Sequence, residues 1–500
     1  MKPPGRVVIL GGGSAGWIAA NLLAVAWGRH GTAVTLVEAP DIATIGVGEG
    51  STPSLKRFFA DIGIAERDWM PRCQATWKVG IRFAGWSPAA PWPDYSHPFT
   101  TQVDVHTEDA FILNCRNRRL GHDVPVQPGD FLLNGRLAAD GKAPMTPPNF
   151  PFRMEYGYHF DAGLLGDYLR EVAVGRGVIH RQARVTAVTR ADNGDIAALA
   201  TDRGEAIEGD VFVDCSGFAG LLIERTLGVP FRSFGDNLFN DAAVVMPTPM
   251  DRAPPVETVA TALSNGWCWT IPLQNRFGNG YVYSSAFTGA DAAEAELRGV
   301  LGVGDDQPAR HLTFRVGQLA RHWERNCVAV GLSQGFIEPL EATALHLVLN
   351  TVELFVRHYE QGEFSARHRD AFNATISARI EGVRDYIVAH YKLNTRTDTD
   401  YWRANAANMA LSEPLRRVLD LWFRRGDLAE ELRRRSDQTQ FGNVSWHCLL
   451  AGYGAFPPTG DERRDDVDFF ADRGIAAFLD GCSLNFPAQA AALERHRHGR

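Results

Sequence analysis

Three glycines near the start of the chain have the spacing that brings a protein backbone close to a phosphate group. Gly11, Gly13 and Gly16 follow the pattern G-x-G-x-x-G between the apolar run at residues 7–10 and an apolar segment, "WIAANLLA". In a strand-turn-helix unit the first glycine permits the tight turn, the second lets a pyrophosphate approach, and the third lets the helix pack on the strand. A glycine-rich turn without a ligand is the alternative. We predict a dinucleotide site in which the helix N-terminus faces the phosphates.

An acidic residue follows this motif at the distance that suits a free ribose hydroxyl. Glu38 ends the second apolar run, "AVTLVE", where a carboxylate can accept a hydrogen bond from the 2′-OH. NAD and FAD both satisfy this pattern. FAD is favoured by a later strand that ends at Gly217 and by the glycine-rich loop "IGVGEGSTP", residues 45–53, which is placed to strap over a flavin. No second G-x-G-x-x-G unit follows, so we expect reducing equivalents to arrive already on the flavin.

A lysine stands in the alternating segment "TWKVGIRF". On a strand, alternate residues share a face, so Trp77, Val79 and Ile81 would lie on one side. Lys78 and Gly80 would lie on the other side. A solvent-facing lysine is the usual outcome. If that face lines a cavity, burial lowers the lysine pKa and makes the amino group available for chemistry.

Two carboxylates flank a proline in "EPLEATALHL". We expect the following helix to begin at Pro339, because proline is favoured in the first helical turn. Glu338 and Glu341 could then complement the positive end of the helix dipole and nothing more. A carboxylate at this place can instead act as a general base, a role that needs geometry more than a large pKa shift.

Aromatic surface is concentrated in the segment "NGWCWTIPLQ". Trp267 and Trp269 are two residues apart, so on a strand both indoles point the same way, and Pro272 can end the strand. Two core tryptophans on a sheet are the plain interpretation. The segment becomes more specific when it is considered together with Lys78.

Length, charge and cysteine content exclude several classes of protein. The 500 residues suit two or three packed units, and a net charge of −8 argues against a nucleic-acid surface. Seven cysteines without a C-x-x-C pair indicate reduced thiols rather than a disulfide framework or a zinc site, which favours the cytoplasm and no metal. The early apolar segment "WIAANLLAVAW" is too short for a membrane span, so we expect no membrane contact.

These elements together predict an α/β fold with some α+β character. A Rossmann-like FAD-binding domain of the flavin monooxygenase type would use residues 1–90, 155–235 and 320–350. A substrate-side sheet region would use residues 91–154 and 236–319. Apolar residues at i, i+3 and i+4 spacing predict a mainly helical C-terminal region, 351–500, that caps the substrate opening.

Seven segments, in order, resemble the flavin-dependent tryptophan halogenase family, a two-component group that uses FADH2. They cover most of residues 7–454 and read "GGGSAGW", "GVGEGSTPSL", "ATWKVGIRF", "YHFDAGLLGDYL", "GWCWTIPL", "GFIEPLEATAL" and "HYKLNTRTDTDYW". The resemblance is specific because the lysine and the W-x-W-x-I-P box occur together. It implies chlorination or bromination of an electron-rich arene such as an indole, with O2, halide and a separate flavin reductase as partners.

The resemblance also implies roles for individual residues. Hypohalous acid made at reduced FAD would travel through a tunnel to Lys78, beside the substrate. Glu341 would position the electrophile and take the proton that leaves the ring. Trp267, Trp269 and Ile271 would wall the flavin side, so that halide rather than the arene takes the oxygen. Cofactor contacts would come from Gly11, Gly13, Ser14, Ala15, Gly16, Glu38, Gly48, Gly50, Val185, Leu332 and Leu345.

The halide site implied by the resemblance departs from the family pattern P-L-E-S-T-G. The backbone N–H groups of Thr343 and Ala344 would bind the halide, and a backbone site tolerates a change of side chain. Ala342 replaces the serine of the pattern, and Ala344 replaces its glycine. Alanine takes positive φ less readily than glycine, so Ala344 is our reason to expect altered halide affinity, with bromide favoured.

Substrate contacts implied by the resemblance are His97, Phe99 and Trp446, which would sandwich an aromatic ring. Free-tryptophan enzymes of the family carry tyrosines and an acid that hold the amino-acid group, shortly before the second tryptophan. Here the segment between residues 435 and 446 reads "SDQTQFGNVS", without tyrosine or glutamate. We therefore expect free indole, a phenol or a larger indole-bearing molecule to react better than free tryptophan. Core packing is the alternative role for these three rings.

Two other functions remain open from the sequence. An aromatic hydroxylase of the same flavin fold is the nearer one, although the chain has no pyridine-nucleotide unit for reducing its own flavin. A non-catalytic FAD-binding sensor or carrier is the other, and in it Lys78 and Glu341 would be incidental. A homodimer is an assembly that the sequence leaves open.

Overall fold

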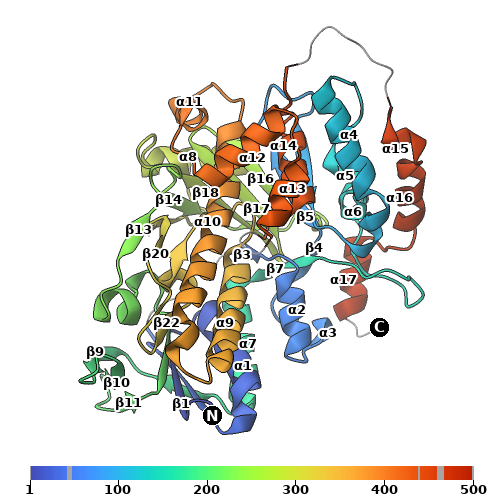
Figure 1. The fold of residues 1–500 in the computed structure, drawn as a ribbon. Helices are drawn as coiled ribbons and strands as arrows, with labels where there is room; N and C mark the ends of the chain where they lie inside the picture. The colour runs from blue at the N-terminus through green and yellow to red at the C-terminus, as the bar shows by residue number, and fades with distance from the viewer. Residues whose placement is uncertain (1, 42–47, 437–439, 459–466, 498–500) are drawn as a thin grey trace.

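The structure, a computed structural model, describes residues 2–41, 48–436, 440–458 and 467–497 (Figure 1). A six-stranded sheet forms its first layer, in the order β21, β22, β12, β1, β2 and β8. These strands are, in chain order, β1 (Arg6–Leu10), β2 (Ala33–Glu38), β8 (Ile179–Gln182), β12 (Val211–Asp214), β21 (Trp323–Glu324) and β22 (Cys327–Ala329). All pairs are parallel except β21 with β22. Distant stretches of sequence thus build one sheet, as the predicted Rossmann-like α/β fold requires.

Helix α1 (Ser14–Trp27) packs on β1 and β2, and α7 (Ala162–Gly175) and α9 (Ala344–Gln361) pack on α1. Figure 1 shows α1 at the bottom of the molecule against α7 and α9, with which it packs. Asn21 donates from Nδ2 to the Leu169 carbonyl at 3.0 Å, and Trp27 donates from Nε1 to Glu360 at 2.8 Å. α1 is apolar on most of its surface because the sheet and two helices surround it.

The second layer is an eight-stranded sheet. Its order is β19 (Arg310–Thr313), β14 (Ala242–Val245), β18 (Arg276–Tyr283), β17 (Gly266–Pro272), β16 (Glu257–Leu263), β5 (Gly80–Ala84) and β6 (Asp94–Pro98), with β15 (Thr248–Pro249) also on β18. A small sheet of β3 (Gly48–Gly50), β7 (Gly157–Asp161) and β4 (Thr76–Lys78) contacts β17 and β18 on one side and α7 on the other. It therefore joins the two layers.

The remaining elements are short or peripheral. Two three-stranded sheets contain β9 (Val185–Arg190), β10 (Ile196–Thr201) and β11 (Ala206–Glu208), and β13 (Phe231–Ser233), β20 (Gly317–Leu319) and β23 (Gly335–Phe336). Helices α2 (Ser54–Asp61) and α3 (Glu66–Trp69) lie between β3 and β4 in sequence, and α8 (Ala290–Leu301) packs on β14 and β18.

The expected single strand around Lys78 is wrong, because the chain changes sheets at Val79. β4 ends at Lys78 and pairs with β7, whereas β5 begins at Gly80 and pairs with β6 and β16. A Cβ on Gly80 would lie 2.7 Å from the His97 carbonyl oxygen, so only glycine allows this close crossing. The break also turns Ile81 toward the same cavity as Lys78, instead of the opposite face.

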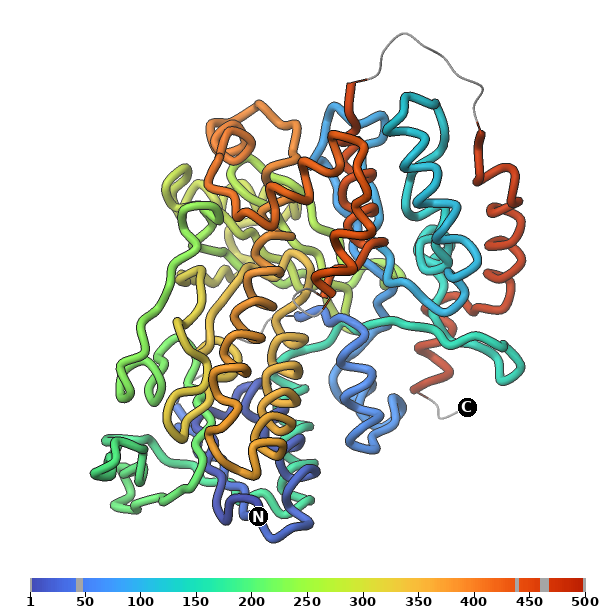
Figure 2. The backbone as a smooth tube through the Cα atoms, in the orientation of Figure 1, coloured from blue at the N-terminus to red at the C-terminus, as the bar shows by residue number. Residues whose placement is uncertain are grey.

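The C-terminal part is mainly helical, as predicted. It contains α10 (Arg369–Leu393), α11 (Asp400–Ala407), α12 (Glu413–Phe423), α13 (Leu428–Arg434), α14 (Asn443–Gly452), α15 (Phe469–Asp472), α16 (Ile475–Ser483) and α17 (Gln489–Arg497). In Figure 2 the red C-terminal helices lie beside the cyan segment that contains α4 (Glu108–Leu120) and α6 (Leu133–Asp140), and α15 and α16 contact these two helices.

Residues 91–154 differ from the sheet region that the sequence suggested. Only β6 is a strand there, and α4, α5 (Pro128–Phe131) and α6 follow it. In α4, Ala110, Phe111, Asn114 and Cys115 are buried at helical spacing. These residues form one buried stripe along the helix, and this stripe packs against the neighbouring elements. The division of the chain into domains stays a prediction.

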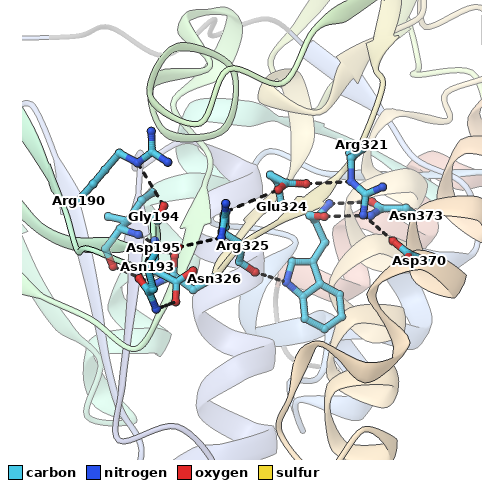
Figure 3. A network of polar contacts seen from close by, with 12 residues as sticks. Arg190, Asn193, Gly194, Asp195, Arg321, Glu324, Arg325, Asn326, Asp370 and Asn373 are labelled. Carbon is cyan, nitrogen blue, oxygen red and sulfur yellow. Dashed lines mark hydrogen bonds and ion pairs between the residues drawn. The ribbon is translucent and has the colours of Figure 1, made fainter.

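A polar network fastens the β21–β22 hairpin to its neighbours (Figure 3). Asn373 on α10 accepts from two consecutive backbone N–H groups of the hairpin at 2.7 and 2.8 Å, and donates back to it at 2.9 Å. Arg321 pairs with Asp370 at 2.6 Å, at the start of α10. On the other side, Arg325 donates to the Asn193 carbonyl at 2.8 Å. The network therefore couples α10 to the outer sheet that contains β9 and β10.

Three expectations about broad class can be compared with the described residues. All seven cysteines are free thiols, as expected from the lack of paired spacing. Within the described ranges, no group of His, Cys, Asp and Glu side chains could hold a metal ion. No described helix is both long and apolar enough to cross a membrane.

Candidate active site

A cavity of about 680 Å³ lies between the two large sheets. Its lining includes residues at the carboxyl ends of β1, β2 and β12, the position at which α/β folds bind ligands, and side chains from the eight-stranded sheet. The predicted site residues that line it are Gly11, Gly13, Ser14, Ala15, Glu38, Gly48, Gly50, Lys78, Val185, Trp267, Trp269, Ile271, Leu332, Thr343, Ala344 and Leu345. Gly16, Glu341, His97, Phe99 and Trp446 lie outside that lining.

The glycine loop in the lining of the cavity has the geometry of a phosphate cradle. Gly11 has φ +115°, and a Cβ there would lie 2.1 Å from the Cys215 carbonyl oxygen. A Cβ on Gly16 would lie 1.9 Å from the Gly11 carbonyl oxygen, so Gly16 packs the helix on the turn. At Gly13, the N-cap of α1, a Cβ would meet no protein atom within 4 Å, and no side chain caps the helix. Free N–H groups at an open glycine suit a phosphate.

Glu38 lies at the end of β2 and faces this loop. A Cβ on Gly12 would overlap the Glu38 carboxylate, so the acid packs directly on the glycine backbone. His180 holds it from β8, with 2.6 Å between Nε2 and Oε1. A carboxylate beside the phosphate cradle can accept from a ribose hydroxyl. Cradle and carboxylate together fit a dinucleotide such as FAD.

Lys78 places a buried ammonium group in the same cavity. The residue is 0% exposed, and Nζ has no hydrogen-bond partner among the described residues. Burial lowers the pKa of Lys78 to about 7, against the charges of Glu341 and Glu257, which raise it. The ring of Phe99 lies 5.5 Å from Nζ. An amino group in this state can both donate hydrogen bonds and act as a nucleophile near neutral pH.

Glu341 is a buried carboxylate held between two histidines. His97 Nδ1 lies 3.1 Å from both carboxylate oxygens, and His390 Nε2 lies 3.0 Å from Oε1. Burial raises the pKa of Glu341, but the charge of His97 and hydrogen bonds from His390 and His97 outweigh it and lower the pKa to about 2. The sequence argument for a general base required no large pKa shift, and this shift arises because two imidazoles, not solvent, surround the carboxylate.

Glu338 is also buried, and it has different partners. Its Oε2 accepts hydrogen bonds of 2.8 Å from Trp267 Nε1, Asn240 Nδ2 and the Tyr391 hydroxyl. Tyr401 donates to the Asn240 carbonyl oxygen at 2.9 Å. Glu338 therefore fixes one indole of the tryptophan pair to α10 and α11, and neither it nor Glu341 is an exposed helix-end charge.

Helix α9 begins later than predicted, and this changes the argument about alanine. Ala344 is its first residue and Thr343 its N-cap, whereas Pro339 lies in the preceding turn and accepts from the Ala342 N–H at 3.0 Å. The positive φ, +55°, belongs to Ala342. Such a conformation costs an L-residue roughly 1 kcal/mol. Ala344 is helical and needs no glycine, so the expectation that it alters halide preference loses its basis.

The two tryptophans lie on β17, which ends at Pro272 as predicted. Both are buried, with ring centroids 6.1 Å apart, and both line the cavity together with Ile271. A Cβ on Gly280 would lie 2.1 Å from the Trp269 ring, so the glycine lets the indole lie flat across β18. Alternate residues of β17 thus present these three side chains to the cavity.

Two of the three predicted stacking residues, His97 and Phe99, lie beside Glu341 and Lys78, but the three rings do not face one another directly. His97 contacts Glu341, and Phe99 lies over Lys78. Trp446 packs edge-on against Tyr386, with ring centroids 4.9 Å apart, and Tyr386 lies 6.0 Å from His97. Tyr386 thus stands between Trp446 and His97, stacked on a further aromatic ring, Phe441, at 3.7 Å.

Several residues of this site were missed from the sequence. His390 and Tyr386 lie four residues apart on α10, so helical spacing around "DYIVAHY" was a usable signal. Asn240 and Thr258 lie in segments without a motif. Glu49 lines the cavity, where burial and, to a lesser degree, Asp161 raise its pKa to about 7.

Part of two sequence predictions lies outside the described residues. The glycine-rich loop at residues 45–53 is described only from residue 48, and the segment between 435 and 446 is described except for 437–439. Gly48 and Gly50 of the first segment line the cavity. Phe441 and Trp446 of the second belong to the aromatic group around Tyr386.

Known proteins are similar to this chain in sequence and in fold over almost its whole length. The family described as tryptophan halogenase matches residues 6–468. Tryptophan 6-halogenase SttH of Streptomyces toxytricini is 37% identical over 84% of this chain and 84% of its own. BrvH, a flavin-dependent halogenase from Brevundimonas sp. BAL3, has a TM-score of 0.87 and 35% identity over 99% of both chains. Xcc4156, a flavin-dependent halogenase from Xanthomonas campestris, has a TM-score of 0.86 and 35% identity over the same share. The chain therefore belongs to the flavin-dependent tryptophan halogenase family, whose members are enzymes that halogenate aromatic substrates.

Proposed function

We propose that this chain halogenates an electron-rich arene by way of Lys78, and that a free or larger-molecule indole is a better substrate than free tryptophan. Reduced FAD, when bound, would supply hypohalous acid from O2 and a chloride or bromide ion. A separate flavin reductase would deliver the FADH2, because the chain has one dinucleotide motif only.

The observation that carries this proposal is the position of the Lys78 ammonium group. Its Nζ is buried, lacks a hydrogen-bond partner among the described residues, and lines the cavity that begins at the glycine loop. Burying an ammonium group without a partner is costly. Such a group is therefore a strong candidate for contact with a reacting ligand.

Lys78 can handle hypohalous acid in either protonation state. As an ammonium it donates a hydrogen bond to the acid's oxygen. As an amine it attacks the halogen, so that an N–halogen bond forms, the O–halogen bond breaks and water leaves. A pKa of about 7 populates both states near neutral pH.

Glu341 is the proposed acceptor of the ring proton. The cationic intermediate of an aromatic substitution is strongly acidic, so a carboxylate of low pKa is base enough to take its proton. His97 and His390 fix the direction of the carboxylate from two sides. An arene beside His97 and Phe99 would have Glu341 on one side and Lys78 on the other.

The proposed halide position is the start of α9, where Thr343 and Ala344 line the cavity and no side chain caps the helix. Backbone N–H groups at a helix N-terminus attract anions. From β17, Trp267, Trp269 and Ile271 also line the cavity, where they would keep the arene away from the flavin. Chloride and bromide both fit this arrangement.

The substrate preference rests on what stands in residues 435–446. Phe441 and Trp446 are apolar, and the segment contains no tyrosine or glutamate that could pair with a free amino acid's ammonium and carboxylate. Transfer of those charges from water without partners is unfavourable. A neutral indole avoids that cost and keeps the aromatic contacts.

Mass spectrometry of an indole incubated with the enzyme, FAD, a flavin reductase, NADH and bromide tests the proposal. A bromine isotope doublet supports halogenation. A gain of one oxygen would instead identify an aromatic hydroxylase. Loss of NADH without any product, on indole, a phenol and a tryptophan-containing peptide alike, would favour the non-catalytic flavin carrier.

A further inference from the structure

A chain of hydrogen bonds beside Lys78 fixes the hydrogen positions of three side chains. Thr76 Oγ1 donates to the Pro272 carbonyl at 2.8 Å, which commits its only hydrogen. Thr76 Oγ1 also lies 3.0 Å from His159 Nδ1, and toward this nitrogen it can only accept. The imidazole of His159 therefore carries a hydrogen on Nδ1.

The same reasoning fixes the hydroxyl of Thr258. His159 is fully buried, and burial together with the charge of Lys78 holds its pKa well below the ordinary value, so the ring is neutral. A neutral ring with hydrogen on Nδ1 has a lone pair at Nε2. Thr258 Oγ1, 3.0 Å from Nε2, must therefore donate to it. Thr258 then offers only lone pairs to any other neighbour.

Thr258 faces the cavity next to Lys78. A Cβ built on Gly50 would lie 3.1 Å from Lys78 Nζ and 3.2 Å from Thr258 Oγ1, so the backbone of Gly50 lies against both polar atoms. Both residues line the cavity. Among the lining residues that β5, β14, β16, β17 and β18 contribute, Thr258 is the one with a hydroxyl group. The full set from these strands is Ile81, Ala243, Thr258, Trp267, Trp269, Ile271 and Val282.

Other groups near Lys78 act on it by charge or through a ring. Glu341 and Glu257 favour its protonated form, and burial opposes it. His159 and Thr258 both lie beside Gly50, and the ring of Phe99 lies 5.5 Å from Lys78 Nζ. None of the described residues hydrogen-bonds Nζ. A fixed acceptor at Thr258 would supply what the buried ammonium lacks.

We propose that Thr258 is a positioning residue. Its Oγ1, held by His159 and Thr76, would accept a hydrogen bond from the Lys78 ammonium group once that side chain turns toward it, a contact that the structure itself does not contain. This inference rests on the proposed function only for the role of Lys78. With one N–H group bound to Thr258, the other two point into the cavity. Lys78 would thus receive hypohalous acid from one defined direction.

Thr258→Val is nearly isosteric and removes the acceptor, so it should lower the pKa of Lys78. The measurement is the pH dependence of Lys78 acetylation by acetic anhydride, read by peptide mass spectrometry on the full-length protein. The chain has five lysines, so the other four serve as internal references. We expect the Lys78 midpoint to move to lower pH by about one pH unit, the effect of losing a hydrogen bond to a charged group.

A second readout is the amount of halogenated product formed per FADH2 oxidised. It should fall about tenfold in Thr258→Val, as expected for about 1.4 kcal/mol of lost positioning, while the rate of FADH2 oxidation stays unchanged. Thr258→Ser should restore both readouts because serine keeps the hydroxyl. Thr261→Val is the matched control, since Thr261 lies on the same strand but on the opposite face.

An unchanged Lys78 midpoint in Thr258→Val, with FAD still bound, would overturn the inference. Thr258→Ala serves if the valine variant does not fold, and the same midpoint shift is required of it. Acetylation does not require turnover. A shifted Lys78 midpoint in an enzyme that yields no halogenated product would therefore support the Thr258–Lys78 contact and contradict the proposed function.

Discussion

Glu341 Oε1 accepts a buried hydrogen bond of 3.0 Å from His390 Nε2. His390 Nδ1 lies 3.1 Å from the Tyr453 hydroxyl. An ionised carboxylate only accepts, so His390 donates at Nε2, and Tyr453 donates to Nδ1 of the neutral ring. Burial lowers the pKa of His390, which agrees with a neutral imidazole between these two groups. Glu341 is therefore held as a carboxylate whose direction is set by α10.

This arrangement predicts a pH effect of His390 substitutions. The pKa of Glu341 is lowered to about 2, so its contribution to stability is present above the ordinary glutamate pKa and is lost as pH falls toward 2. His390→Leu removes a donor and raises that pKa. The acid limb of halogenation rate against pH should then move to higher pH. His390→Gln retains an N–H donor and should leave the limb close to that of the wild type.

Rates of indole halogenation across an acidic pH series measure this effect. FAD absorbance at each pH reports whether the variant stays folded. A leucine variant with the same acid limb as the glutamine variant would show that His390 does not control Glu341.

Lys78→Ala should abolish halogenation and leave the oxidation of FADH2 by O2 intact. The reason is spatial, because Lys78 ends β4 and lies beside Gly50, whereas the glycine loop that would hold the pyrophosphate follows β1. Oxygen consumption and product formation, measured in one assay, separate the two activities. Lys142→Ala is a control, since Lys142 is bound to Ser483, outside the cavity. Equal loss of both activities in Lys78→Ala would contradict this division.

Glu341→Gln should reduce the halogenation rate about 10²-fold or more, as for the loss of a general base, while FAD stays bound. Glu338→Gln provides the comparison, because an amide oxygen can still accept from Trp267, Asn240 and Tyr391. We expect this second variant to lose much less activity. Single-turnover rates with reduced FAD measure both, and a near-normal rate for Glu341→Gln would move the base to another residue.

Gly13→Ala should weaken FAD binding at least tenfold without lowering the melting temperature of the apoprotein. A Cβ at Gly13 meets no protein atom, so its cost appears only when a pyrophosphate occupies the loop. Gly28→Ala, at the other end of α1, also has open space and a helical φ of −57°. It should leave FAD affinity unchanged. Fluorescence titration with FAD compares the two, and equal affinities would place the pyrophosphate elsewhere.

The nucleotide half of the site could be predicted because its chemistry is local. Gly11, Gly13, Gly16 and Glu38 would act through a strand, a turn and a helix within one stretch of the chain, and the spacing itself encodes the geometry. The start of α9 was harder, since Pro339 signals a helix but the chain first makes a turn through Ala342. A propensity rule cannot anticipate a left-handed alanine that tertiary packing enforces.

The sequence predicted His97 as a site residue and offered helical spacing as a signal for His390, but it did not predict that these two histidines hold Glu341. His390 is 49 positions from Glu341 in sequence, and His97 is 244 away. Such contacts depend on how α10 and β6 pack, which hydrophobic periodicity does not specify. The break at Val79 has the same origin, because alternation indicates a strand but not a change of sheet.

The last prediction concerns the substrate, for which L-tryptophan and indole differ only in the charged amino-acid group. If residues 435–446 hold no partner for that group, binding L-tryptophan leaves a carboxylate and an ammonium partly desolvated. Indole avoids this cost and makes the same ring contacts, so its kcat/KM should be the higher of the two, with bromide and with chloride alike. A tryptophan-containing peptide tests the larger substrates, because its amide groups carry no such charges. A tenfold preference for L-tryptophan corresponds to about 1.4 kcal/mol of transition-state binding. That outcome would require an amino-acid clamp from other residues, and it would reverse the assigned preference while leaving the halogenation chemistry in place.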